Sequence, residues 1–119
     1  MIRRQYIDIE GLKYYCNHGV LEQEKLVGNW FEVSLRLYYD ASHAMRADNI
    51  TAALNYAVIV EIVDKVMAIH SDLLEHIAGR IQEAVLEKFP KIEAGMIRVS
   101  KPHPPISTPM QNVSFTLEW

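Results

Sequence analysis

The sequence lacks the features that mark secreted and membrane proteins. It contains one cysteine among 119 residues, Cys16, and therefore no pair that could form an intrachain disulfide. No apolar run approaches the roughly 20 residues needed to cross a bilayer. The first residues, 1–4, leave no room for the charged and apolar regions of a signal peptide. We therefore expect a cytoplasmic protein with no membrane partner.

Basic residues are also scarce. Twelve Lys and Arg stand against 15 Asp and Glu, and the formal net charge is −3. This balance argues against nucleic acid or an anionic membrane as the main partner. Apolar residues make up 50% and charged residues 23% of the chain, as in ordinary globular proteins. The length fits a single domain over residues 1–119.

Motifs that hold metals or nucleotides are absent as well. There is no Gly-x-Gly-x-x-Gly, no Walker sequence and no histidine or cysteine cluster with the spacing of zinc ligands. We therefore expect neither a metal nor a cofactor, and histidines that are solvated or cap helices. The five histidines are His18, His43, His70, His76 and His103.

Cys16 is the one candidate nucleophile of the thiol type. A nucleophilic thiol needs a positioned base, and His18 stands only two residues away. Nearness in sequence is weak support for that geometry. A buried or half-buried structural thiol is the favoured interpretation.

Apolar and polar residues alternate in four segments, which predicts four strands. These segments are residues 2–15, 31–39, 97–99 and 113–119. Between the first two, the polar stretch 17–29 contains two glycines and is interpreted as a long loop.

The middle of the chain has helical periodicity instead. Apolar residues recur at helical spacing over 56–70, and a second helix follows, with Ser71 or Asp72 as its cap and Pro90 just beyond its end. The order ββααββ predicts an α+β fold, in which two helices cover one face of a four-stranded antiparallel sheet. The open edges of such a sheet favour association of copies into an oligomer.

Lys101 is the most informative single residue. It has the parity of Ile97 and Val99, so it is expected to emerge at the end of the buried face. Prolines at 102, 104 and 105 stiffen the backbone that follows. A desolvated lysine is suited to proton transfer near neutral pH. Local pattern alone still favours a lysine that extends from the strand end into water.

Three other residues have ordinary structural explanations when each is taken alone. An acid such as Glu75 is favoured in the first turn of a helix by the helix dipole. Tyr56 begins the first predicted helix and can simply pack at its end. Glu24, in the polar stretch 17–29, is solvated by default.

Together, these residues resemble the dihydroneopterin aldolase family along nearly the whole chain. The order and the separations of the motifs are specific, although each motif alone is weak. The matching motifs are His18-Gly19-Val20 with Glu24, Gly28, Leu54-Asn55-Tyr56, Leu73-Leu74-Glu75-His76-Ile77-Ala78, and Lys101-Pro102 with Pro105-Ile106.

The resemblance implies the tunnelling fold, in which several subunits join their sheets into an oligomeric barrel. Tetramers or octamers with active sites between subunits, and a small-molecule pterin substrate, are then expected. Glu75 and the backbone at Leu74 would bind the amino-pyrimidine edge of the pterin. Tyr56 would stack on the ring and assist catalysis, Glu24 would lie by the substrate side chain, and Lys101 would be the catalytic lysine.

The implied reaction is retro-aldol cleavage of 7,8-dihydroneopterin in folate biosynthesis, without metal or cofactor. Alternatives on the same scaffold are 2′-epimerisation of dihydroneopterin or its triphosphate, oxygenation as a side activity, and a non-catalytic pterin-binding oligomer. A triphosphate would favour extra cations in 17–29, where Lys25 is the one lysine. Cys16-Asn17 and Ser107-Thr108 depart from the commoner family pattern, which leaves the side-chain specificity open.

Overall fold

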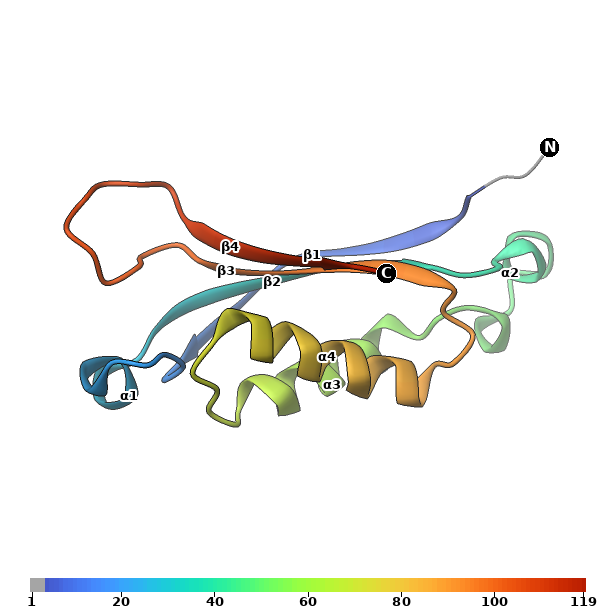
Figure 1. Cartoon of the computed structure of the whole chain (residues 1–119). Helices are drawn as coiled ribbons and strands as arrows, with labels where there is room; N and C mark the ends of the chain where they lie inside the picture. Colours follow the sequence, from blue (N-terminus) through green and yellow to red (C-terminus); the bar gives the residue numbers. More distant parts are fainter. Residues whose placement is uncertain (1–3) are drawn as a thin grey trace.

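The four predicted strands form one antiparallel sheet in the computed structural model, which describes residues 4–119 (Figure 1). The strands are β1 (Tyr6–Cys16), β2 (Asn29–Tyr38), β3 (Ala94–Lys101) and β4 (Val113–Glu118). They are hydrogen-bonded in the order β1-β2-β3-β4, with β1 and β4 at the edges. Every neighbouring pair is antiparallel. The predicted α+β class is confirmed.

One bulge in β1 keeps its apolar residues on the inner face. The register with β2 shifts between Ile9 and Leu12, and Gly11 between them has a φ of 67°. The Gly11 amide donates a hydrogen bond to Ser34 Oγ at 2.9 Å. Since a strand alternates sides at every residue, one extra residue is needed for both Ile9 and Leu12 to contact the core.

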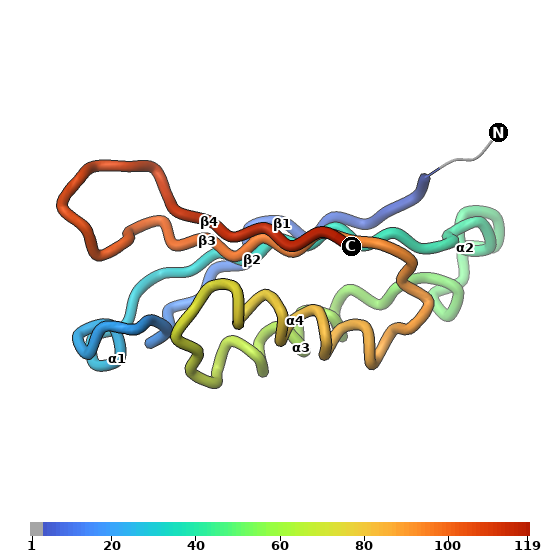
Figure 2. Tube along the Cα trace, in the orientation of Figure 1, coloured from blue at the N-terminus to red at the C-terminus, as the bar shows by residue number. Residues whose placement is uncertain are grey.

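The two main helices cover the apolar face of the sheet (Figures 1 and 2). They are α3 (Tyr56–Met67) and α4 (Leu74–Lys88). Asn55 caps α3 by accepting hydrogen bonds from the amides of Ala57 and Val58. The core between the layers is fully apolar. Its largest side chains are each at most 2% exposed. They are Phe31, Leu35, Leu37, Ile59, Met67, Ile77, Ile81 and Ile97.

The stretch 17–29 was predicted to be a loop, and this is wrong in part. Residues Glu22–Val27 form a short helix, α1. Its six residues are too few for an apolar period to show in the sequence. Two further short helices, α2 (Ser42–Ala47) and the 3-10 helix η1 (Ile50–Ala52), lie between β2 and α3.

The predicted cap of the second helix is also wrong. The N-cap position of α4 is Leu73, which forms no side-chain capping hydrogen bond. Ser71 is 3% exposed and lies in the turn before the helix. Its peptide groups bind residues 18 and 19 instead. Asp72 accepts a hydrogen bond from His70. Tertiary contacts therefore determine the roles of Ser71 and Asp72.

No helix within residues 4–119 has both the length and the apolar character needed to span a membrane.

We expect the substitution Ile81→Ala to destabilise the chain by about 2–5 kcal/mol, because Ile81 is fully buried between α4 and the sheet. Ile50→Ala is the matched control, since Ile50 is 75% exposed. Its effect should stay within about 0.5 kcal/mol. Urea unfolding at one fixed protein concentration measures both. Equal losses in the two variants would contradict this assignment of the core.

Candidate active site

A buried ion pair joins the end of β3 to α1. The Lys101 Nζ donates to Glu24 Oε2 at 2.6 Å. The side chains of Lys101 and Glu24 are 13% and 7% exposed. The two residues are 77 positions apart in the sequence. Lys101 therefore emerges at the end of the buried face, as its parity predicts. The prediction that Glu24 is solvated is wrong. A buried charge requires a partner, and these two residues pair with each other.

Glycine at position 19 makes room for the Glu24 carboxylate. A Cβ atom built on Gly19 would lie 2.4–2.6 Å from the carboxyl atoms of Glu24, and the φ of Gly19 is 137°. Any other residue would be both strained and in steric conflict there. The second Glu24 oxygen accepts a hydrogen bond from the Leu21 amide at 3.3 Å, in the first turn of α1. Backbone geometry and a local hydrogen bond thus fix this carboxylate.

His18 connects the ion pair to the turn before α4. Its Nδ1 accepts a hydrogen bond from the Ser71 amide at 3.0 Å, and the Gly19 amide donates to the Ser71 carbonyl, also at 3.0 Å. The ring lies edge-on against Phe31 with centroids 5.2 Å apart, and Lys101 Nζ lies 5.6 Å from the same Phe31 ring.

Burial lowers the pKa of His18, so its ring stays neutral. Since Nδ1 accepts, the proton is on Nε2, which has no hydrogen-bond partner among residues 4–119. The prediction of solvated or capping histidines is therefore wrong for His18. Sequence alone treats a histidine as solvated by default, so the burial of His18 was not predicted. Its place in the His18-Gly19 motif was the one available signal.

Leu74 and Glu75 begin α4, a few residues after Ser71. Leu74 is half-buried against the core, whereas Glu75 is exposed. The Glu75 carboxylate accepts no hydrogen bond from another side chain or amide within residues 4–119. The contacts of Ser71 with His18 and Gly19 place this helix start at the same end of the molecule as the ion pair (Figure 1).

Tyr56 is the one predicted site residue that lies elsewhere. It is the first residue of α3 and is 63% exposed. The helix runs from Tyr56 towards Met67, at the end of the molecule where α4 begins (Figure 1). Twelve helical residues span about 18 Å. One chain therefore brings Glu24, Lys101, Leu74 and Glu75 to one end of the molecule and leaves Tyr56 at the opposite end of α3.

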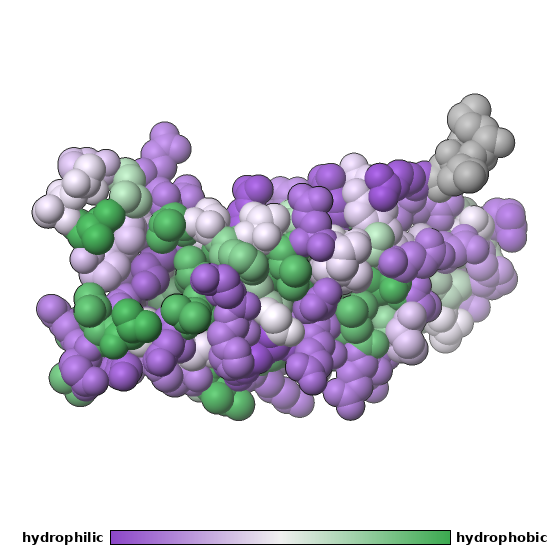
Figure 3. All heavy atoms as spheres, in the orientation of Figure 1, coloured by the Kyte–Doolittle hydropathy of each residue, from purple (hydrophilic) through white to green (hydrophobic). Residues whose placement is uncertain are grey.

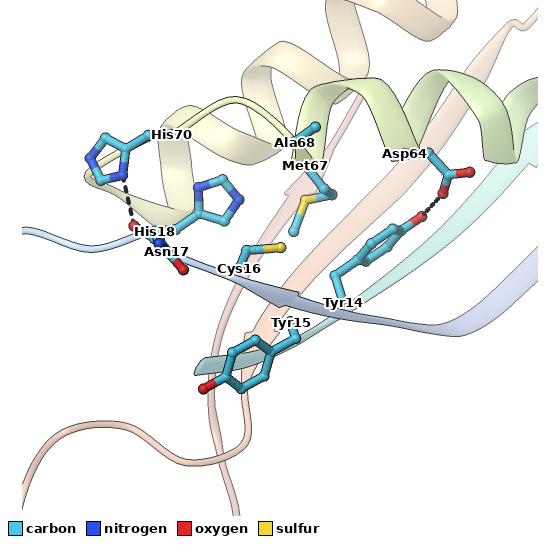
Figure 4. A pocket seen from close by; sticks show the side chains of 9 residues that line it. All are labelled: Tyr14, Tyr15, Cys16, Asn17, His18, Asp64, Met67, Ala68 and His70. Atoms are coloured by element: carbon cyan, nitrogen blue, oxygen red, sulfur yellow. Dashed lines mark hydrogen bonds between the residues drawn. The ribbon is translucent and has the colours of Figure 1, made fainter. Parts of the chain in front are cut away.

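A groove lies between the last residues of β1 and the end of α3 (Figure 4). Its volume is about 650 Å³. The Tyr14 hydroxyl donates to Asp64 Oδ1 at 2.7 Å, and burial together with this carboxylate raises the pKa of Tyr14. Burial also raises the pKa of the half-buried Cys16 thiol, which stays protonated. A thiol in that state is a poor nucleophile, which agrees with the structural interpretation of Cys16.

Residues 4–119 contain no group of three or more His, Cys, Asp or Glu side chains placed to hold a metal ion.

The substitution Gly19→Ala should destabilise the fold by about 1–3 kcal/mol, because the new methyl group needs a strained backbone and displaces Glu24. Gly79→Ala is the matched control. A Cβ at helical Gly79 meets nothing within 4 Å, so this variant should gain about 0.4–1 kcal/mol. Thermal unfolding of the two variants checks the pair, and a stabilised Gly19→Ala protein would contradict the geometry.

Comparison of the sequence with known proteins identifies one family. The family model described as FolB: Dihydroneopterin aldolase matches residues 7–118. A dihydroneopterin aldolase of Streptococcus pyogenes is 32% identical over 113 residues, which cover 94% of this chain and 95% of the relative.

Two solved structures share the fold. The E. coli dihydroneopterin aldolase in complex with neopterin has a TM-score of 0.87 at 24% identity, covering 97% of this chain and 98% of the other. A Burkholderia dihydroneopterin aldolase bound to guanine has a TM-score of 0.75 at 15% identity, covering 98% and 90%. The match over residues 7–118 and the identity to the streptococcal enzyme show that this chain belongs to the dihydroneopterin aldolase family.

Proposed function

We propose that the chain, acting as one domain, cleaves 7,8-dihydroneopterin by a retro-aldol reaction into 6-hydroxymethyl-7,8-dihydropterin and glycolaldehyde. The observation that carries this proposal is the buried Lys101–Glu24 pair, at 2.6 Å, in a chain of this family. The pair puts an acid and a base in contact at the end of the molecule where α4 begins with the exposed Glu75. A proton donor and a proton acceptor are what the reaction requires of the protein.

The chemistry of the substrate explains why the protein needs so little else. Breaking the C–C bond between the two hydroxyl-bearing side-chain carbons nearest the ring releases an electron pair, and the adjacent ring C=N bond accepts it. The proton of the departing hydroxyl is removed as glycolaldehyde leaves. One proton is then returned to the enamine carbon that remains, so the two transfers balance. Lys101, as the neutral amine, accepts the hydroxyl proton through an ordered water and becomes an ammonium that Glu24 holds in place. That ammonium then returns one proton to the enamine carbon.

Glu75 and the backbone at Leu74 are proposed to bind the ring. A carboxylate accepts two parallel hydrogen bonds from a ring N–H and an adjacent amino group. Guanine and neopterin share this amino-pyrimidine edge, and relatives of this chain have been solved with each of them. The open Glu75 carboxylate in the first turn of α4 supports this role.

Tyr56 is proposed to reach the site from a neighbouring subunit, because its own chain places it at the far end of α3. The outer edges of β1 and β4 have no strand partner within residues 4–119, which favours joining of sheets into a tetrameric or octameric barrel. Apolar residues are also exposed at the end of the molecule that carries α1 and the loop after β3 (Figure 3). They include Val20, Leu21, Leu26, Val27, Trp30 and Ile106. Such a patch favours association.

The charge near the site favours the aldolase over an epimerase that takes a triphosphate. Lys25 is the one lysine of the stretch 17–29, and it lies 3.5 Å from Glu22. A polyphosphate would need several free cations there.

Chelator-treated protein incubated with 7,8-dihydroneopterin should release glycolaldehyde. Lys101→Met should lower kcat by about a hundred- to ten-thousand-fold, because it removes the proton carrier and keeps the apolar stem. Lys88→Ala, at an exposed position of α4, serves as the control and should keep full turnover. If the 2′ epimer forms and no glycolaldehyde appears, the protein is an epimerase and not an aldolase. Full activity of Lys101→Met would contradict the mechanism.

Glu75→Ala should weaken pterin binding more than it slows the bound reaction, since Glu75 contacts the ring and carries no proton. Glu87→Ala, on the exposed face of the same helix, is its control. Fluorescence titration with neopterin and the split between KM and kcat measure the difference. A change confined to kcat would argue against ring binding by Glu75.

Mixing two inactive variants tests whether the site is shared between subunits. Lys101→Met and Tyr56→Ala subunits, unfolded together and refolded in equal amounts, should recover about a quarter of the wild-type turnover, because one interface in four then has both intact residues. No recovery above the separate variants would place Tyr56 and Lys101 in the same subunit's site.

A further inference from the structure

Both ring nitrogens of His70 face oxygen acceptors. Nδ1 lies 2.8 Å from the carbonyl oxygen of Asn17, and Nε2 lies 2.7 Å from Oδ1 of Asp72. A carbonyl and a carboxylate have no hydrogen to donate. A neutral imidazole carries only one N–H and would leave one of these contacts without a proton. The doubly protonated ring satisfies both.

The contact with Asn17 joins two segments of the proposed site that are 53 positions apart, whereas the contact with Asp72 is local. Asn17 precedes α1, and its side-chain amide donates to the Lys25 carbonyl at 2.9 Å. His70 and Asp72 lie in the turn that leads into α4. The ring of His70 thus ties the segment that carries Glu24 to the segment that carries Glu75, beside the Gly19–Ser71 backbone contact.

The charges around His70 favour its imidazolium form. Asp72 is in direct contact, and this hydrogen bond is the main cause that raises the pKa of His70. Lys25 on α1 opposes it at longer range. His18, stacked on the ring at a centroid distance of 6.2 Å, adds no charge, because burial keeps it neutral. On α4, the charge of His76 helps to lower the pKa of Asp72. The Arg80 guanidinium, also on α4, donates hydrogen bonds to the Ile69 and Val66 carbonyls and to Ser71 Oγ.

We propose that His70 is a positioning residue for the reaction: its imidazolium holds the Glu24-bearing segment against the start of α4, and loss of one ring proton loosens that contact. The effect of His70 on catalysis rests on the proposed function. The tether itself rests only on the two hydrogen bonds of the ring, to Asn17 and Asp72. Because the pKa of His70 is raised, the contact is complete below the ordinary histidine pKa of about 6.5 and weakens as pH rises through the raised value.

Two measurements test the structural part without any turnover. In ¹⁵N-histidine-labelled wild-type protein at pH 6, both ring nitrogens of His70 should give imidazolium shifts. Hydrogen exchange at the Gly19 amide should be faster in His70→Gln, because both N–H groups of its side-chain amide are on one nitrogen and cannot replace two separate ring nitrogens. A neutral tautomer of His70 at pH 6, or unchanged exchange at Gly19, would overturn the proposal.

The pH profile tests the catalytic part. His70→Gln should lower kcat/KM by about tenfold at pH 6, within the hundredfold that a displacement of about 1 Å in a positioned group can cost. The ratio of the wild-type kcat/KM to that of the variant should fall towards one as pH rises past the raised pKa of His70. Asp72→Asn should move the decline of kcat/KM to lower pH, since it removes the carboxylate that favours the charged ring. A ratio that stays constant with pH would overturn the positioning role.

His43→Gln is the matched control, because His43 is exposed on α2, at the opposite end of the molecule from α1 (Figure 1). It should match wild type at every pH, and a pH-dependent loss in it would also overturn the specific role of His70. Wild-type protein that releases no glycolaldehyde would refute the proposed function instead. The ring shifts and the Gly19 exchange would still decide whether the tether exists.

Discussion

Two opposite charges lie out of water at the end of β3, and the arrangement around them follows from the need to keep them paired. Lys101 and Glu24 reach each other only because a glycine at position 19 lets the carboxylate approach the backbone. Removing one partner would leave an isolated buried charge, which costs far more than the pair contributes. The short helix α1, the neutral His18 and the peptide of Ser71 together hold this geometry.

The same geometry explains why the site is open on one side. α1, the end of β3 and the start of α4 converge at one end of the molecule. The exposed Glu75 carboxylate and the apolar surface around α1 are not covered by other parts of residues 4–119. Tyr56, with its ring in solvent, lies at the start of α3. Within residues 4–119 the candidate site is therefore exposed to solvent on this side.

Prediction from sequence worked where one physical rule determined the outcome. Alternation identified the strands, helical spacing identified α3 and α4, and the parity of Lys101 placed it at the end of the buried face. It failed where contacts distant in sequence decide. Glu24 is polar in a polar stretch, and nothing local distinguishes it from a solvated acid. His18 was likewise treated as an ordinary histidine, although it is 2% exposed.

The sequence by itself determined the α+β class, the order of the four strands and the two main helices and, through its ordered motifs, membership of the family. Short-range patterning is sufficient for these because each element buries its own apolar stripe. Only the tertiary structure decided which polar groups meet. The Lys101–Glu24 pair, the exchange of hydrogen bonds between residues 18–19 and Ser71, and the two acceptors of His70 all join residues more than 50 positions apart, except for the local contact with Asp72. Such pairings depend on how the sheet and helices pack, which no local pattern records.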